Sequence, residues 1–230
     1  MMMNLSRFML CLCLSLLPCL PALAGLQIGG TRVLFDGTRQ AATISITNKD
    51  KVTNLVQSWL SAIDGNSPEK DSFIVTPPLF RLEADGQATI RIVRSGKPLP
   101  EDRESMLWLN IKGIPATTQE SGKNTLQIAI NSQIKLIYRP ASLKGSMPEH
   151  YAGKLRWNSI GGNIEVTNPS PHYMNLSTAS VGGKNLVGPY YVAPYSKTVI
   201  SEKGLPEHGK AIWQVLNDFG MRGEVQSQAY

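Results

Sequence analysis

Short runs of alternating apolar and polar residues follow one another along almost the whole chain, and this pattern constrains the fold more than any other feature. A strand with one buried face has a period of two, whereas a helix repeats every 3.6 residues. The runs are rich in β-branched and aromatic residues and are separated by Gly, Pro, Asn and Asp, which is typical of an all-β sandwich. No helical period extends beyond a turn or two. The clearest runs are residues 42–47, 55–60, 88–93, 106–111 and 125–138.

A break near residues 140–148 divides the runs into two sets. Arg139-Pro140 ends the longest run, and the Pro, Gly and Ser residues after it are typical of a linker. We therefore expect two β-sandwich domains of about 115 and 85 residues, each within the usual size of a domain. Beyond the break, strands are expected at residues 155–157, 164–167, 174–179, 190–192, 198–201 and 211–216.

The first 24 residues have the pattern of a secretory signal peptide. Arg7 provides a positive charge, residues 8–20 are apolar, and Ala22-Leu23-Ala24 is a small-x-small cleavage motif. Two prolines interrupt the apolar part, so an uncleaved membrane anchor is the weaker alternative. We expect cleavage after Ala24, which leaves 230 − 24 = 206 residues. No later run is apolar enough to cross a bilayer, and we expect no direct membrane insertion.

All three cysteines, at positions 11, 13 and 19, lie in this predicted signal peptide. The rest of the chain can therefore form neither a disulfide nor a thiolate site. Loss of Arg7 lowers the formal charge from +6 to 6 − 1 = +5. Because Lys and Arg are scattered, with no run of five, we expect most of them on the solvated surface and no nucleic-acid partner.

The sequence contains no motif for catalysis, nucleotide binding or metal binding. The three histidines, His150, His172 and His208, have no ligand spacing, and we expect them on the surface or in loops. There is no nucleophile elbow, P-loop or dinucleotide-binding glycine cluster. We therefore expect no enzyme, no cofactor and no metal ion, although distant carboxylates could still meet in the fold.

The longest run, residues 125–138, allows two interpretations. Leu126, Ile128 and Ile130 alternate with small or polar residues, and the same pattern resumes at Ile134. Alternation alone favours an ordinary core strand. A long strand with an exposed apolar face would instead recruit another chain. The pattern by itself leaves both open.

Five segments, in order along the chain, carry a more specific signal. They read TRVLFDG (31–37), TPPLFRL (76–82), LPEDRES (99–105), QIKLIYRP (133–140) and NDFG (217–220). Together they resemble the PapD-like family of periplasmic pilus-assembly chaperones, over essentially the whole chain after residue 24. The resemblance implies two immunoglobulin-like β-sandwich domains in an L- or boomerang-shaped arrangement, with a cleft between them. It implies an N-terminal domain at residues 25–143, which carries a donor strand, and a C-terminal domain at residues 144–230.

The resemblance also implies the function. A protein of this kind binds and stabilises pilus subunits in the periplasm and delivers them to an outer-membrane usher, without ATP, by donor-strand complementation. Arg32 and Lys135 match the basic pair that anchors the subunit's C-terminal carboxylate through charge-assisted hydrogen bonds. The donor strand would present Leu126, Ile128 and Ile130.

Simple alternation puts Lys135 on the opposite face of the strand from Leu126, Ile128 and Ile130. Either the strand twists or bulges between them, or its two faces serve the cleft and the donor row separately.

Two further sets of residues follow from the resemblance. An ion network between the domains, which fixes the shape of the cleft, would consist of Glu104, Arg139 and Asp218. A contact surface for the usher would include Leu55, Gln57, Thr76 and Pro77. Most X-Pro bonds are trans, so the sequence does not decide whether Thr76-Pro77 is cis.

The loop between Ile114 and Thr125 is short and has no cysteine, which resembles the short-loop branch of the family. The main alternative function is a pilus subunit or adhesin-like structural protein. A subunit would be one incomplete sandwich with an alternating N-terminal extension, whereas residues 25–30 are few and glycine-rich. A periplasmic enzyme on a sandwich scaffold is a second alternative. An exposed strand edge is also compatible with self-association of the free protein.

Overall fold

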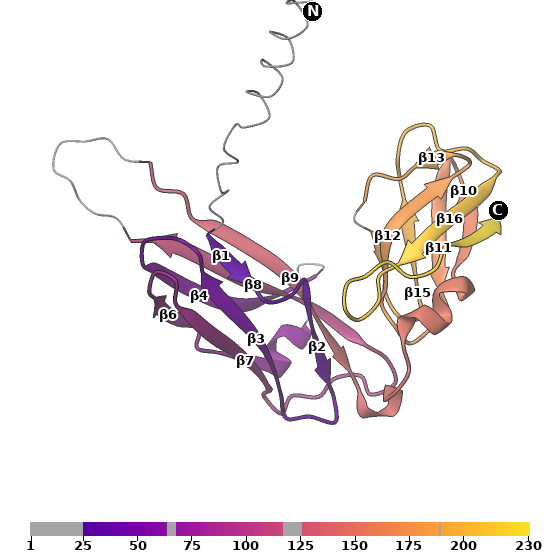
Figure 1. The fold of residues 1–230 in the computed structure, drawn as a ribbon. Coiled ribbons are helices and arrows are strands. Elements are labelled where there is room, and N and C mark those ends of the chain that lie inside the picture. The colour runs from indigo at the N-terminus through magenta and orange to yellow at the C-terminus, as the bar shows by residue number, and fades with distance from the viewer. Residues whose placement is uncertain (1–24, 64–67, 117–125, 189) are drawn as a thin grey trace, which may run out of the picture.

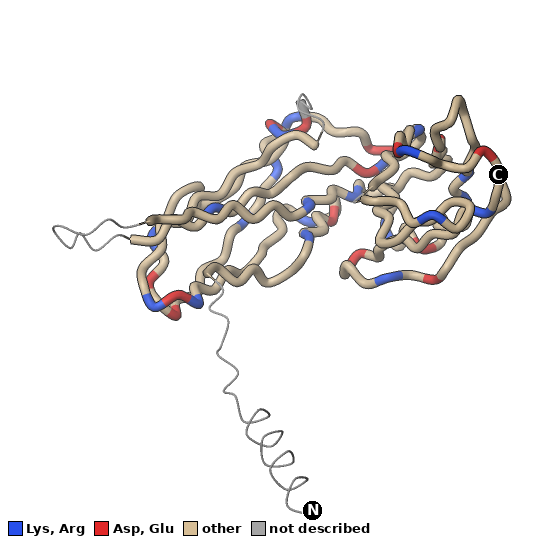
Figure 2. Tube along the Cα trace, turned by 90° about the horizontal axis from the view of Figure 1, so that it is seen from above, with Lys and Arg blue, Asp and Glu red and all other residues tan. Residues whose placement is uncertain are grey.

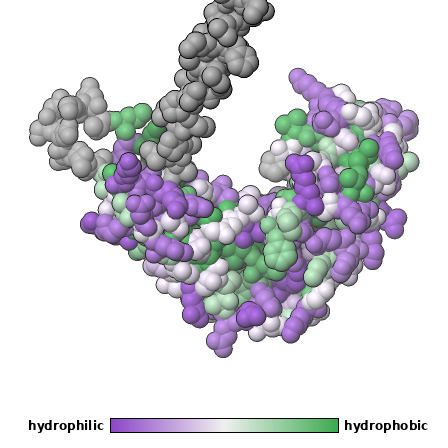
Figure 3. Space-filling view, viewed as in Figure 1, coloured by the Kyte–Doolittle hydropathy of each residue, from purple (hydrophilic) through white to green (hydrophobic). Residues whose placement is uncertain are grey.

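The computed structural model describes residues 25–63, 68–116, 126–188 and 190–230. Within these ranges most of the chain is β-strand and forms two sandwiches that meet at an angle (Figure 1). Figure 3 shows the hollow that this angle leaves between the two lobes. The expected all-β class and boomerang-shaped pair of sandwiches are confirmed. The predicted signal peptide lies outside the described residues.

Two sheets form the first sandwich, with strand orders β1-β3-β7-β5 and β2-β9-β8-β4-β6. All neighbouring strands in them are antiparallel except β2 and β9, which are parallel. The bounds are β1 (Leu26–Ile28), β2 (Arg32–Asp36), β3 (Ala41–Asn48), β4 (Asn54–Ala62), β5 (Phe73–Thr76), β6 (Leu79–Leu82), β7 (Gln87–Arg94), β8 (Ser105–Pro115) and β9 (Ile130–Arg139).

Alternate residues of these strands fill the space between the two sheets, as the period of two predicts. Three aromatic rings lie at one end of this core, Phe35, Phe73 and Tyr138, with centroids 5.3 to 5.9 Å apart. Because β2, β5 and β9 each supply one ring, the aromatic cluster ties the parallel β2–β9 pair to the opposite sheet.

Strands β10 to β17 form the second sandwich. One sheet has the order β10-β11-β15, and the other has the order β13-β12-β16-β17, with β14 also paired to β12. Trp157 and Trp213, from opposite sheets, are buried 5.3 Å apart between them. The bounds are β10 (Arg156–Ile160), β11 (Asn163–Asn168), β12 (Met174–Val181), β13 (Lys184–Asn185), β14 (Tyr191–Val192), β15 (Ser196–Ile200), β16 (Lys210–Val215) and β17 (Gln226–Ala229).

The segment between the sandwiches contains two short 3-10 helices, η2 (Ala141–Leu143) and η3 (Pro148–Lys154), and a third, η1 (Pro68–Ser72), lies in the first sandwich. The sequence predicts a linker at residues 140–148 but gives no sign of the short helices η2 and η3 there. Helices this short are invisible to a periodicity argument, because a helical period needs a window of 11 or more residues.

The longest run also forms a shorter strand than its alternation predicts. β9 begins at Ile130, which pairs with Gly113 of β8. Residues 126–129 continue beyond this ladder without being part of a strand. The prediction is wrong for these residues because alternation describes the two faces of a strand and says nothing of a partner strand. Thr125 and most of the loop after Ile114 lie outside the described residues.

Figure 2 shows Lys and Arg positions spread along both sandwiches. In the parts of the chain that the structure describes, no helix is long and apolar enough to span a membrane.

Candidate binding cleft and edge strand

The parallel pairing of β2 with β9 brings two basic residues together at the junction of the sandwiches. Arg32, the first residue of β2, is the direct partner of Lys135 on β9. Paired residues of neighbouring strands point to the same face of the sheet. The sequence separates these two residues by about a hundred positions, and the ladder makes them neighbours.

Lys135 is held by groups from both sandwiches. Its Nζ donates a hydrogen bond to Oδ1 of Asn175 on β12. The same Nζ lies 5.8 Å from the ring centroid of Trp108 and 5.5 Å from that of Tyr191. Burial lowers the pKa of Lys135 to about 8, and repulsion from Arg32 acts in the same direction.

Arg32 has an unmet hydrogen-bonding group. Its Nη1 donates to the carbonyl oxygen of Asn217, at 3.1 Å. Its Nε is buried and has no hydrogen-bond partner among the described residues. Burial lowers the pKa of Arg32, while attraction to Asp218 opposes that shift. Two adjacent, partly desolvated cations with a free donor form a site that favours an anion such as a carboxylate.

A buried ion network lies beside this pair. Arg139 Nε donates to Glu104 Oε1 at 2.8 Å, and its two terminal nitrogens bind both oxygens of Asp218, at 2.6 and 2.7 Å. Burial disfavours the charge on Arg139, but the hydrogen bonds and attraction from Asp218 and Glu104 outweigh it and raise the pKa. The structure therefore brings together the three residues that the sequence analysis grouped.

The network contains a member that the sequence analysis missed. His172 is fully buried, and its Nδ1 lies 2.9 Å from Glu104 Oε1. The other carboxylate oxygen of Glu104 accepts a hydrogen bond from the backbone nitrogen of Tyr173, at 2.8 Å. His172 does lie in a loop, before β12, but it is buried there, whereas His150 and His208 are exposed. No sequence spacing connects His172 with Glu104, so only the fold could reveal the contact.

Asn175 is the second residue of this junction that sequence reasoning missed. It is a buried amide between Met174 and Leu176, two buried apolar residues of β12. A polar residue within a buried apolar run normally has a hydrogen-bond partner. That signal was available in the sequence, although the partner, Lys135, was not.

The predicted donor residues form an exposed row at the start of β9. Leu126, Ile128 and Ile130 are 87%, 63% and 61% exposed. Further along β9 the residues in the same phase, Ile134 and Leu136, are buried in the first core. The apolar face of the strand therefore continues past the end of the sandwich into solvent, which normally marks an interaction site.

A hollow adjoins this row. A cavity of about 280 Å³ is lined by residues that include Ile128 and Ile130 of the row, Leu26 of β1 and Ile111 of β8. The part of the row formed by Ile128 and Ile130 therefore borders a cavity that reaches the core residue Ile111.

Ile130, the last residue of the apolar row, and Lys135 of the basic pair lie on opposite faces of β9. The register of β9 against β8 runs without a shift from Ile130 to Tyr138. Of the alternatives that the sequence left open, a bulge is therefore excluded between Ile130 and Lys135.

Of the four residues expected to form a contact surface, Leu55 and Gln57 lie on β4, Thr76 ends β5, and Pro77 begins the turn to β6. Leu55 and Gln57 point to solvent from β4, and Thr76 is exposed at the end of β5. The Thr76-Pro77 bond is cis. Ser58 Oγ donates to the carbonyl oxygen of Pro77 at 2.7 Å, which fixes this turn next to β4. Exposed Leu79 of β6, the direct partner of Gln57, extends the apolar part of this surface.

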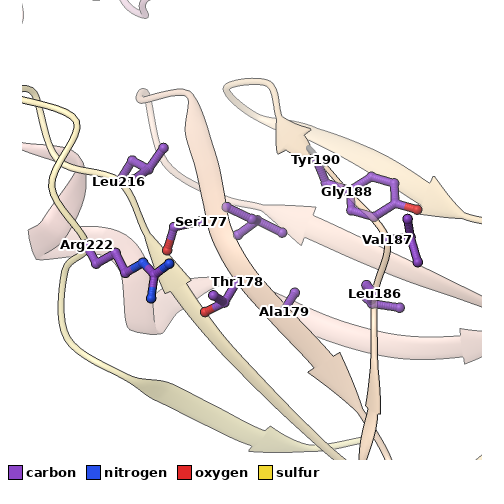
Figure 4. A pocket seen from close by; sticks show the side chains of 10 residues that line it. Ser177, Thr178, Ala179, Leu186, Val187, Gly188, Tyr190, Leu216 and Arg222 are labelled. Atoms are coloured by element: carbon purple, nitrogen blue, oxygen red, sulfur yellow. The ribbon is translucent and has the colours of Figure 1, made fainter. Parts of the chain in front are cut away.

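Another cavity, of about 620 Å³, lies on the second sandwich (Figure 4). Figure 4 shows side chains of β12, such as Ser177 and Thr178, on one side and the segment with Val187 on the other. Among its described lining residues Arg222 carries the one charge. Nothing in this arrangement indicates a reaction. In the described residues there is also no group of three His, Cys, Asp or Glu side chains that could hold a metal ion.

Family models cover both sandwiches. Residues 25–144 match the model "Pili and flagellar-assembly chaperone, PapD N-terminal domain", and residues 150–227 match "Pili assembly chaperone PapD, C-terminal domain".

Known proteins agree with these matches. The chaperone protein LpfB of Salmonella typhimurium is 36% identical, over 98% of this chain and 99% of that protein. A chain in the solved complex of Salmonella enterica SafA pilin with the SafB chaperone superposes with a TM-score of 0.81 at 40% identity, over 91% of this chain and 98% of that chain. The E. coli chaperone DraB gives a TM-score of 0.76 at 37% identity, over 89% of this chain and 95% of that chain.

Proposed function

Because this chain belongs to the PapD-like family of pilus-assembly chaperones, we propose that it binds pilus subunits in the periplasm and stabilises them until they are assembled in a chaperone–usher pathway. It acts by binding and not as an enzyme. The observation that carries the proposal is the pairing of Arg32 on β2 with Lys135 on β9, next to an exposed aliphatic row that leads into β9.

The basic pair anchors the C-terminal carboxylate of a subunit. Lys135 Nζ and the free Nε of Arg32 supply donors of the kind that a carboxylate accepts. Partial burial strengthens such charge-assisted hydrogen bonds, because water competes less with the ligand. In the free protein Asn175 Oδ1 occupies part of the hydrogen-bonding capacity of Lys135 and holds it in place.

The exposed row completes an incomplete subunit. A chain that adds a strand to an open sheet gains backbone hydrogen bonds, and alternate side chains enter pockets of the partner. Leu126, Ile128 and Ile130 have the spacing for this role, and their exposure supports it. Without a subunit, the row is a surface through which the free protein could associate with a second copy.

The remaining assignments belong to the same proposal. Residues 1–24 are a cleaved signal peptide, and residues 25–143 and 144–230 are the two domains. The short segment after Ile114, which has no cysteine, supports membership of the short-loop branch. The surface with Leu55, Gln57, Thr76 and Pro77 contacts the usher. The alternative of a pilus subunit is less favoured, because both chaperone domain models match this chain in order.

Co-expression with pilus subunits tests the proposal. Tagged wild-type protein and the double variant R32A/K135A are produced in the periplasm together with subunits encoded beside chaperones of this family, and complexes are recovered through the tag. Wild type should recover an equimolar complex and the double variant none. The matched control is R81A/K97A, which removes two exposed cations of the same sandwich. If R32A/K135A and wild type recovered the subunit equally, Arg32 and Lys135 would not be the anchor of its carboxylate.

A further inference from the structure

His172 lies where the two sandwiches and the segment between them meet. Its ring is 0% exposed. Nδ1 is 2.9 Å from Oε1 of Glu104, which precedes β8 in the first sandwich. Nε2 is 2.7 Å from Oγ of Ser146, between η2 and η3. His172 itself belongs to the turn before β12, so a single imidazole contacts all three parts of the molecule.

The partners determine where the ring carries hydrogen. An ionised carboxylate only accepts hydrogen bonds, so Nδ1 donates to Glu104. In the neutral ring Nε2 then accepts from the hydroxyl of Ser146. In the protonated ring Nε2 donates instead, and the Ser146 hydroxyl can turn toward Tyr151 Oη, 3.5 Å away. The contact with Glu104 is the same in both forms.

Glu104 connects this contact to the cleft. Its Oε1 also accepts from Arg139, which binds Asp218 with two further hydrogen bonds. The residue before Asp218 is Asn217, whose carbonyl oxygen accepts from Arg32. A continuous set of contacts therefore leads from the imidazole to one cation of the anchor.

We propose that His172 is a positioning residue: it fixes Glu104 and Ser146 relative to the second sandwich and so sets the distance between Arg32 and Lys135 on one wall of the cleft and Asn175 on the other. The part about ligand binding rests on the proposed function, whereas the part about the two sandwiches does not. A merely local role for His172, as a filler of the second core, would leave the angle between the sandwiches unchanged.

Two substitutions separate these roles. His172→Leu introduces an apolar side chain of similar bulk and removes both hydrogen bonds, so Glu104 loses a buried partner. His172→Asn places an amide nitrogen near the position of Nδ1 and keeps the donor for Glu104. If His172 is a positioning residue, H172N keeps the wild-type arrangement of the two sandwiches and H172L loses it. A filler role predicts the opposite order, because Leu fills more space than Asn.

The first measurement is the distance between the sandwiches in the free protein. Exposed Lys51 and Lys203 are replaced by cysteine and spin-labelled, and pulsed dipolar spectroscopy gives the distribution of distances. The chain's own cysteines, at positions 11, 13 and 19, lie in the predicted signal peptide. We expect a narrow distribution for wild type and H172N and a broader or shifted one for H172L. Thermal unfolding shows whether both sandwiches remain folded; if H172L unfolds, H172Q, which has no donor near Nδ1, replaces it.

The second measurement is the affinity for a subunit, with wild type, H172N and H172L. We expect H172L to bind on the order of tenfold more weakly and H172N nearly as well as wild type, since residues that couple sites through packing change binding by factors of this size. Unchanged distances in both H172L and H172Q would overturn the proposal. A broader distance distribution in H172L with an unchanged affinity for the subunit would also overturn it, because the angle between the sandwiches would then not affect binding in the cleft. Failure of wild type itself to bind any subunit would count against the proposed function, and the distances alone would then decide the role of His172 in the angle.

Discussion

At the scale of single residues, the charge of Lys135 depends strongly on its surroundings. Burial between Trp108, Tyr191 and Asn175, and the neighbouring Arg32, bring its pKa down to about 8 from 10.5. A bound carboxylate favours the protonated form, so binding and protonation support each other.

Subunit affinity should therefore fall as the pH rises above about 8. Below this pH the lysine is already charged in the free protein, and binding takes up no proton. Above it the free lysine is neutral, and each further pH unit should weaken binding by up to about tenfold, until the pKa of the bound state is reached. Titration of a subunit's C-terminal peptide between pH 6 and 10, by calorimetry, measures this slope. The variant K135R, which stays charged, should give a flat profile; an equal slope for K135R would assign the effect to another group.

The sequence could supply Arg32 and Lys135 only through a family resemblance, since two basic residues a hundred positions apart share no pattern. Their proximity is a consequence of the parallel β2–β9 ladder. His172 and Asn175 could not be assigned, because their roles consist of contacts with Glu104 and Lys135 across the junction. The apolar neighbours of Asn175 were a local sign that it has a polar partner, but nothing local identified that partner, and nothing local marked His172.

At the scale of elements, alternation located most strands to within a few residues. It failed at the start of β9, where the apolar phase continues beyond the ladder into solvent. The sequence could not distinguish a buried face from an exposed one, because both have the same period. The short strands β1, β5, β6, β13 and β17 were missed, since a few residues cannot show a period.

Replacing Ile128 or Ile130 by Ala should weaken subunit binding and leave the fold intact. Each side chain buried in a partner contributes at most about 1.5–3 kcal/mol, or roughly ten- to a hundredfold in affinity. Because both residues are exposed in the free protein, the free energy of unfolding should change by less than about 0.5 kcal/mol. Competition binding and urea denaturation measure the two quantities. Val199→Ala, an equally exposed aliphatic residue of the second sandwich, is the matched control and should affect neither.

At the scale of the whole molecule, the junction is polar where the two cores are apolar. Arg139 and Glu104 are nearly buried and bind residues of the second sandwich through Asp218 and His172. Arg103 adds a contact, its guanidinium 5.0 Å from the ring centroid of Tyr195. Paired buried charges require specific geometry, so such a junction favours one relative orientation of the two sandwiches.

Arg139→Leu should therefore destabilise the protein strongly. It leaves Glu104 and Asp218 buried without their cation, and the loss of one partner of a buried ion pair costs about 3–5 kcal/mol. Chemical denaturation, monitored by tryptophan fluorescence, measures the loss. Arg81→Leu removes an exposed ion pair with Glu83 and should change the free energy of unfolding by less than about 1 kcal/mol. A similarly small change for R139L would show that the network contributes little.

The use of both faces of β9 also constrains how the gene for this protein can change in length. Ile130 and Lys135 are an odd number of positions apart, and that parity puts them on opposite sides of the strand. Losing or gaining one codon between them would turn the aliphatic row toward the side of the basic pair, whereas a change of two codons would preserve the two-sided arrangement. Descendants of this gene should therefore tolerate insertions and deletions in this stretch only in even steps.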